Sequence, residues 1–402
     1  MRILITEEAL ESGKGHWPSY IGGLAGELRG AGDEVDVLIH RDAGAEVCQR
    51  VGGTPWFSRN CWMDRRSQGK LGGLLHNWHF RRDTLRWLAN QPVYDWVFAL
   101  TMRLQHLVAF AVMARAGAIP QSTRFLLLFV QGFGRYCGPD RPGEFPSNLS
   151  TRIARLAFRW MAPAVRAGRV VLAAETQGMQ DELQRFTGLP VALFPHPVEA
   201  NAEKLKVRNA EMLESRSGER PITLTCPGFA RYEKGNDLMQ EAIKQLLASD
   251  DYCHLRFVMQ WPQAFTLPDG SACAPDPTLA ADERVEFVNH SLDSAAYEAL
   301  LARTDLVVLP YRRESYHNRL SRVAIEAASR GIPLVCMSQT WCDDVLQQVG
   351  SGVAIADETP QALANAIREA VDHLPALQRA AAEGAGRVIN FHSAAHFRRL
   401  LV

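Results

Sequence analysis

Short apolar runs alternate with segments of helical periodicity from the first residues of the chain. The runs 2–6 and 34–39 predict buried strands. Between them, Ile21, Leu24 and Leu28 share one face of a predicted helix. Because strands that alternate with helices build parallel sheets, the opening of the chain predicts a β-α-β unit of Rossmann type and an α/β fold.

The alternation continues in two series that are separated by a charged stretch. Residues 200–219 carry many charges and few apolar side chains, which predicts a linker with a short helix. A second series begins with the apolar run 222–225. The pattern therefore predicts two domains, 1–200 and 201–385. Later strands of the first series are predicted at 95–100, 124–130, 170–174 and 191–194.

Length and composition narrow the class of protein. The 402 residues are enough for two or three domains with separate cores, and the formal net charge of zero argues against a general nucleic-acid binder. The most apolar stretch, 96–119, contains Arg103 and Arg115 and is not predicted to span a membrane. The eight cysteines are scattered without a C-x-x-C pair, and the chain opens directly into a strand. A reduced, cytoplasmic protein is expected.

Residues 302–335 form the most informative stretch of the chain. The apolar run 306–309 predicts a buried parallel strand, and a polar loop follows Pro310. Ser321 stands at the N-cap of a predicted helix that ends before Gly331. A polar loop thus feeds a helix N-terminus at the carboxyl end of a parallel strand, where open α/β sheets bind ligands and where backbone N–H groups favour phosphate.

This stretch resembles the donor-binding motif of GT-B glycosyltransferases, most closely glycosyltransferase family 4 (group 1). In that family the helix carries two glutamates separated by seven residues. Glu326 matches the second, and Asn318 stands in place of the first. A Tyr-rich variant of the loop has Arg before Ser-Gly; Arg319 and Ser321 fit this variant, whereas Arg322 replaces the glycine.

A second resemblance lies in the loop 227–235, PGFARYEKG. The family places an Arg and a Lys, three apart and followed by Gly, against the donor diphosphate, and Arg231, Lys234 and Gly235 match this pattern. Breaking a sugar–phosphate bond releases a nucleoside diphosphate, and fixed cations stabilise the charge that develops on it. The alternative interpretation is a salt-bridged surface pair.

The resemblance implies a GT-B fold: two Rossmann-like domains face each other across a cleft, and a final helix, 386–402, crosses back to the first domain. The first domain would bind the acceptor and the second a UDP- or GDP-linked sugar. Transfer with retention of configuration is implied. No metal and no cofactor are expected, because the chain lacks a D-x-D motif and a pair of cations can replace the divalent ion.

Individual roles follow from the same resemblance. Glu326 would accept hydrogen bonds from the ribose hydroxyls, and Arg231 and Lys234 would act as the catalytic cations on the leaving diphosphate. The other donor-side candidates are Gly15, Gly228, Asn318, Arg319, Ser321 and Arg322.

The acceptor side is less well defined by the sequence. Many relatives offer a histidine after the strand 124–130, but this chain has Gln131 there. His16 and His106 are candidates for a similar place, although a lone histidine is more often structural. Gly15 either lines the cleft or makes only a tight turn.

Basic and aromatic residues are interleaved in 62–88, for example Trp78 beside Arg81 and Arg82. Such a segment suits an anionic membrane surface or a phosphate-bearing acceptor; the alternative is an ordinary basic helix whose tryptophans pack inward. We therefore expect a bacterial cytoplasmic glycosyltransferase, in peripheral contact with the inner face of the plasma membrane, that acts on a sugar or lipid-linked acceptor. The alternatives are a nucleotide-sugar epimerase of the same fold and a non-catalytic nucleotide- or sugar-binding protein, which Asn318 and Gln131 would suit.

Overall fold

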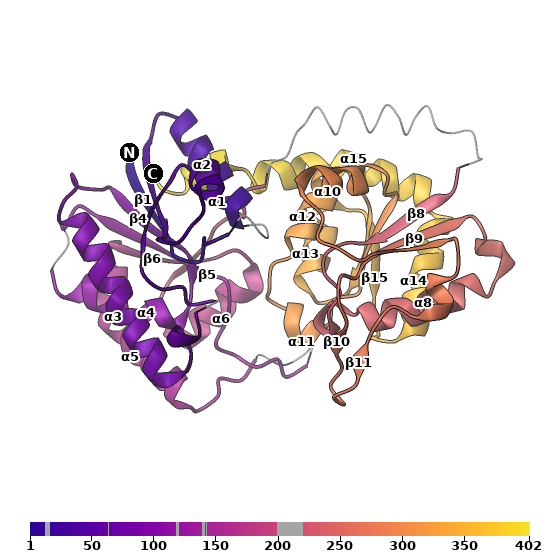
Figure 1. Cartoon of the computed structure of the whole chain (residues 1–402), viewed down its shortest axis with the longest axis horizontal. Coiled ribbons are helices and arrows are strands. Elements are labelled where there is room, and N and C mark those ends of the chain that lie inside the picture. Colours follow the sequence, from indigo (N-terminus) through magenta and orange to yellow (C-terminus); the bar gives the residue numbers. More distant parts are fainter. Residues whose placement is uncertain (13–16, 63, 118–119, 139–140, 142, 199–219) are drawn as a thin grey trace. The chain divides into compact units, whose positions relative to one another are not determined.

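The computed structural model describes residues 1–402 except 13–16, 63, 118–119, 139–140, 142 and 199–219 (Figure 1). The described chain forms two compact units. The first consists of Met1–Cys137, Arg141–Val198 and Ser393–Val402, and the second contains residues 220–392. The predicted linker with its short helix, 200–219, lies outside the described residues.

A seven-stranded parallel sheet forms the centre of the first unit, in the order β3-β2-β1-β4-β5-β6-β7. Its central strands are buried except for the first residues of β1 and β5, because helices cover both faces. Its strands are β1 (Arg2–Glu7), β2 (Glu34–His40), β3 (Gly53–Phe57), β4 (Trp96–Met102), β5 (Arg124–Phe129), β6 (Val170–Ala174) and β7 (Val191–Leu193).

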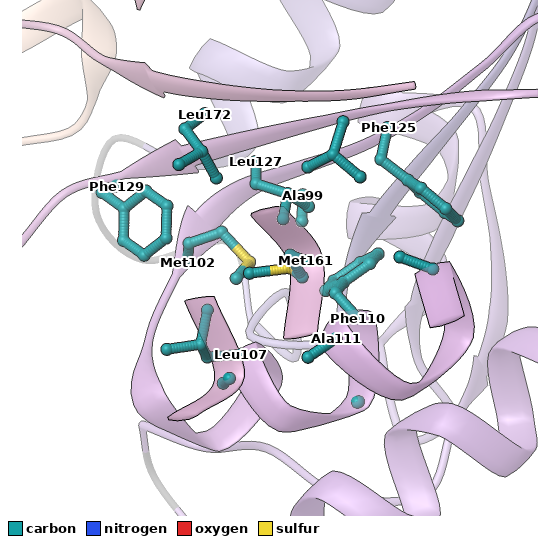
Figure 2. Close-up of a cluster of buried hydrophobic side chains, with 14 of the residues drawn as sticks. Ala99, Met102, Leu107, Phe110, Ala111, Phe125, Leu127, Phe129, Met161 and Leu172 are labelled. Atoms are coloured by element: carbon teal, nitrogen blue, oxygen red, sulfur yellow. The ribbon is translucent and has the colours of Figure 1, made fainter. Parts of the chain in front are cut away.

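Two hydrophobic clusters hold these layers together. On one face, Met102 and Leu127 of the sheet meet Phe110 of α4 and Met161 of α5 (Figure 2). On the other face, Ile21 and neighbouring side chains of α1 pack against the sheet. The helices of this unit are α1 (Trp17–Gly30), α2 (Ala45–Val51), α3 (Gly69–Leu88), α4 (Leu104–Arg115), α5 (Leu149–Arg166), α6 (Gln177–Thr187) and α16 (Ala394–Arg399).

The end of the chain belongs to the first unit. Helix α15 ends at Phe391, and the short α16 follows it. Phe397 is fully buried against Phe98 and Phe194, and the Arg398 guanidinium lies 2.6 Å from the Asp33 carboxylate. The last residues therefore complete the core on the α1 face of the first sheet.

The second unit repeats the plan with a six-stranded parallel sheet, in the order β12-β9-β8-β13-β14-β15, and a small β10-β11 hairpin. Helices α8 and α14 pack on one face, and α12, α13 and α15 contact one another on the other (Figure 1). The strands are β8 (Ile222–Cys226), β9 (Leu255–Gln260), β10 (Phe265–Thr266), β11 (Ala272–Cys273), β12 (Val285–Val288), β13 (Leu306–Leu309), β14 (Leu334–Met337) and β15 (Gly352–Ile355). The helices are α8 (Asn236–Leu247), α9 (Pro277–Ala280), α10 (Ser294–Ala302), α11 (Arg313–Tyr316), α12 (Arg322–Ser329), α13 (Trp341–Val349), α14 (Pro360–Asp372) and α15 (Leu374–Phe391).

The prediction of an α/β protein with two Rossmann-like domains is confirmed. The strand at 306–309 and the N-cap at Ser321 have the predicted bounds. The sequence pattern missed α2 and β3, because β3 is an edge strand with Pro55 at its centre and two exposed positions. Among the described residues, no helix is long and apolar enough to cross a membrane.

Candidate active site

The loop after β8 is shaped by two glycines. Gly228 and Gly235 have φ values of +86° and +65°, in the left-handed region that favours glycine. A Cβ atom at position 235 would lie 2.0 Å from the carbonyl oxygen of Pro310. Asn236 closes the loop, because its side-chain oxygen accepts the Arg231 backbone N–H at 3.0 Å. The loop is thus fixed against the segment that follows β13, and only glycine fits at position 235.

Lys234 lies in this loop, and its ammonium group lies close to Gly228. A Cβ atom at position 228 would lie 2.6 Å from Nζ. Within the described part of the chain, Nζ forms no hydrogen bond or ion pair; the Tyr311 ring lies 5.5 Å away. Burial lowers the pKa of Lys234 to about 8, and the neighbouring Arg231 and Arg319 contribute to the shift. Three cations therefore converge on one loop surface, an arrangement suited to an anion.

Arg231 keeps half of its side chain exposed. Its guanidinium lies 3.5 Å from the Glu233 carboxylate, an exposed pair that contributes little to stability. The guanidinium is therefore available for a ligand. The alternative of a simple surface salt bridge describes this contact but gives no role to the unpaired ammonium of Lys234.

Arg312 ties the two loops of the second unit together. Its backbone N–H donates to the Glu233 carbonyl and its Nε donates to the Tyr232 carbonyl, each at 3.0 Å. Its guanidinium also pairs with Asp237 at 2.5 Å and stacks over the Tyr232 ring. The loop after β8 and the loop after β13 consequently form one rigid rim at the carboxyl edge of the sheet.

Glu326 is held in place by two donors. The Tyr297 hydroxyl donates to one carboxylate oxygen at 2.9 Å, and Arg322 Nε donates to the other at 2.7 Å. The structure therefore places Arg322 beside Glu326, one helical turn away, as an i,i+4 pair. These two hydrogen bonds fix the orientation of the carboxylate.

The start of α12 lies at the same edge. Ser321 is the N-cap residue and its Oγ accepts the Ala324 N–H at 3.3 Å. Asn318 is buried, and the Arg319 guanidinium lies over the Tyr316 ring at 5.2 Å. The donor-side candidates of the second unit thus cluster at the ends of β8 and β13, the two central strands of its sheet.

The acceptor-side candidates lie in the first unit, which is described separately. Gln131 is exposed in the loop after β5. That loop rests on Glu182, whose carboxylate accepts the backbone N–H groups of Phe133 and Gly134 at 2.6 and 2.8 Å. Gly15 and His16 lie outside the described residues.

His106 is buried at the start of α4. Its Nε2 lies 2.7 Å from the Glu8 carboxylate, and its Nδ1 accepts the Arg103 backbone N–H at 3.3 Å. Burial alone would raise the pKa of Glu8, but the neighbouring His106 and His76 have the larger combined effect and lower this pKa to about 2. The structure therefore places His106 in a buried hydrogen bond with Glu8.

Several of these contacts could not be predicted from spacing. Tyr297 lies 29 positions before Glu326, and Arg312 had no assigned partner in the sequence. Glu8 and Glu182 were also missed, because an isolated carboxylate carries no local signal. In the sequence, only the glycines on either side of Lys234 indicated that this loop is conformationally constrained.

The fold and the rim define an α/β protein with a cluster of cationic side chains at the carboxyl edge of its second sheet. Residues 220–373 match the family model described as Glycosyl transferases group 1. This match covers the whole rim from β8 to α12, and it confirms the predicted resemblance to a group 1 glycosyltransferase. No curated protein matches the chain.

Solved structures with the same fold cover the entire chain. Anabaena Alr3699/HepE in complex with UDP-glucose is 14% identical, covers 100% of this chain and 98% of its own, and has a TM-score of 0.63. Sucrose-phosphate synthase from Thermosynechococcus elongatus is 14% identical with the same coverage and a TM-score of 0.64. An alpha,alpha-trehalose-phosphate synthase (UDP-forming) from Burkholderia vietnamiensis is 14% identical, with the same coverage and a TM-score of 0.62. These similarities confirm the predicted GT-B fold.

Proposed function

We propose that this chain transfers a sugar from a nucleotide sugar to an acceptor, and that the second unit binds the donor. The observation that carries the proposal is the unpaired ammonium of Lys234, enclosed by a glycine loop together with Arg231 and Arg319. A half-buried cation without an anionic partner loses part of its hydration, and an anionic ligand would complete the site. The family match over 220–373 and the UDP-glucose bound by Alr3699/HepE make a nucleoside diphosphate sugar the natural ligand.

The cations would act on the leaving group. As the sugar–phosphate bond breaks, negative charge develops on the diphosphate, and Lys234 and Arg231 stabilise it from fixed positions. The N-terminus of α12, capped by Ser321, adds backbone N–H groups to the same edge. We propose that this set serves in place of a divalent ion and that transfer proceeds with retention, as the family resemblance implies.

Glu326 would select the nucleotide. Its carboxylate is oriented by Tyr297 and Arg322, so it can accept hydrogen bonds from two adjacent ribose hydroxyls without reorganisation. Asn318 is buried at the same rim, where the resemblance places the first glutamate. A neutral amide there keeps the rim more cationic than a second carboxylate would.

For the acceptor, we propose a lipid-linked or phosphate-bearing molecule in bacterial glycan synthesis, reached from the cytoplasmic side. The support is the outer face of α3, where Leu71, Leu74, Leu75 and Trp78 are half or more exposed at helical spacing. The exposed Arg82 lies over the Trp78 ring at 5.2 Å. Apolar side chains flanked by arginines suit peripheral contact with an anionic membrane.

Binding measurements test the donor assignment. Calorimetric titration with UDP and GDP should give a dissociation constant for one of them that rises at least tenfold in Arg231→Ala, Lys234→Ala and Glu326→Ala. Lys244→Ala is the matched control, because Lys244 is a paired surface cation on α8. Equal affinity in all four variants would remove the basis of the proposal. Incubation with the donor alone separates the alternative epimerase, which would convert the donor sugar without an acceptor.

A further inference from the structure

Four buried side chains of the first unit converge at the carboxyl end of β1. They come from separate segments: Glu8 follows β1, Cys61 lies after β3, His76 is on α3 and His106 is on α4. At most 2% of each residue is exposed. One ligand atom from each, a carboxylate oxygen, a sulfur and two imidazole nitrogens, lies within 4.8 Å of all the others.

The spacing is close to that of a tetrahedral metal centre. With zinc bonds of about 2.0–2.3 Å, ligand atoms of such a centre are roughly 3.3–3.6 Å apart. Glu8 Oε1 lies 3.6 Å from His76 Nε2. Side-chain movements of less than about 1 Å would bring the remaining ligand atoms to these separations.

His76 is placed as a metal-ligating histidine would be. Its Nδ1 lies 3.0 Å from Ser67 Oγ, which can accept a hydrogen bond from an N–H group at Nδ1. Its Nε2 is buried and has no hydrogen-bond partner among the described residues. A ligating histidine usually donates its other ring N–H to a neighbouring oxygen, which fixes the tautomer and points the free lone pair at the metal. An unpartnered nitrogen at a buried position is suited to a ligand that the protein itself does not supply.

His106 is arranged differently. Because Nδ1 accepts the Arg103 backbone N–H, the proton resides on Nε2, and this N–H donates to Glu8 Oε1 at 2.7 Å. The Cys61 backbone N–H approaches the same oxygen at 3.4 Å. His106 therefore orients the Glu8 carboxylate and is not itself free to ligate.

We propose that Glu8, Cys61 and His76 bind a divalent transition ion of the Zn²⁺ class, with His106 as a positioning residue for Glu8. A set of thiolate, imidazole and carboxylate suits zinc, whereas Mg²⁺ and Ca²⁺ require oxygen ligands throughout. Binding converts the Cys61 thiol to a thiolate and releases its proton to solvent. The ion stays at this site and takes no part in sugar transfer.

The position of the site suggests what the ion does. It would join the end of β1 to the loop after β3 and to the first half of α3, the part that carries Leu71, Leu74 and Leu75. A metal that binds only the folded state stabilises it by mass action. The ion would thereby fix the position of α3, which carries the exposed apolar face.

The test measures metal directly. The full-length protein is stripped with a chelator, incubated with excess Zn²⁺, dialysed and analysed by elemental mass spectrometry, and its melting temperature is recorded with and without Zn²⁺. We expect one Zn²⁺ per chain, a raised melting temperature, and a thiolate-to-cobalt charge-transfer band when Co²⁺ replaces Zn²⁺. Cys61→Ser and His76→Asn should lose all three signals, whereas Cys336→Ala, which alters a buried thiol of β14, should keep them.

His106→Gln provides the finer comparison. A positioning role predicts weaker binding with the cobalt–thiolate band preserved. Zinc retention that does not depend on Cys61 and His76 would identify adventitious surface histidines and overturn the proposal. The absence of both retained zinc and a melting shift in the wild-type protein would overturn it equally. Neither result bears on the donor site, since the two sites lie in different units.

Discussion

The low pKa of Lys234 gives a pH dependence that can be calculated. Burial places this pKa at about 8, well below the ordinary value for lysine, so the ammonium loses its proton in a mildly alkaline buffer. The charged form binds the diphosphate, and binding must therefore weaken as pH rises through 8. With a pKa of about 8, roughly nine tenths of the free protein is charged at pH 7 and roughly one tenth at pH 9.

The expected effect is about a tenfold rise in the dissociation constant of the nucleoside diphosphate between pH 7 and pH 9, or about 1.4 kcal/mol. The ligand contributes little, because the second ionisation of a terminal phosphate occurs near pH 6. Calorimetric titration at a series of pH values and constant ionic strength measures this change. Constant ionic strength matters because salt screens exposed charges.

Lys234→Arg is the matched control, since a guanidinium keeps its charge throughout this range. Its dissociation constant should vary less than twofold over the same interval, whatever its absolute value. A flat profile in the wild-type protein, or an equal slope in Lys234→Arg, would refute the reasoning that a neutralisable ammonium holds the diphosphate.

Three further predictions follow from the same contacts. Gly235→Ala should lower the free energy of unfolding in urea by roughly 2 kcal/mol or more, because the added Cβ meets the Pro310 carbonyl. The control Gly270→Ala, at a position with φ of +87° and open space, should lower it by only about 1–2 kcal/mol. Equal losses would contradict the close packing of the two loops. Tyr297→Phe removes one hydrogen bond from Glu326, so the dissociation constant of the nucleotide should rise about three- to tenfold. The dissociation constant of inorganic diphosphate, which has no ribose, should not change. A parallel change for both ligands would argue against a contact between Glu326 and the ribose. Replacing Leu74 and Trp78 by Glu should abolish flotation of the protein with anionic vesicles at low salt. The control Val93→Glu, at an equally exposed position, should leave flotation unchanged. If the wild-type protein does not float, the proposed membrane contact is wrong.

Local sequence signals were sufficient for the fold and for the outline of the donor rim. Buried parallel strands are continuous apolar runs, so the strands predicted at 306–309 and 124–130 could be recognised from the sequence. Ser321 and Gly331 mark the ends of α12 by chemistry that acts within a few residues. Lys234 and its flanking glycines were visible for the same reason.

Contacts between distant segments were not readable. Glu8, Cys61 and His76 come from separate segments of the chain, and the packing of α3 against α4 and β3 brings them together. His106 was an acceptor-side candidate without a predicted partner, and its partner is a glutamate 98 positions earlier. The pairing of Arg322 with Glu326 was also not predicted, although the two residues are one helical turn apart. Tertiary packing determines which distant residues form pairs, and this packing cannot be inferred from a single sequence.

The central claim is that the cationic loop of the second unit promotes departure of a nucleoside diphosphate from a sugar. Incubating the protein with a panel of UDP- and GDP-linked sugars, and measuring released nucleoside diphosphate by chromatography, tests this most directly. Slow hydrolysis of one donor is expected without an acceptor, and it should be lost in the Arg231→Ala, Lys234→Ala double variant and retained in Lys244→Ala. Release that persists in the double variant, or a wild-type protein that neither binds nor cleaves any donor, would contradict the account.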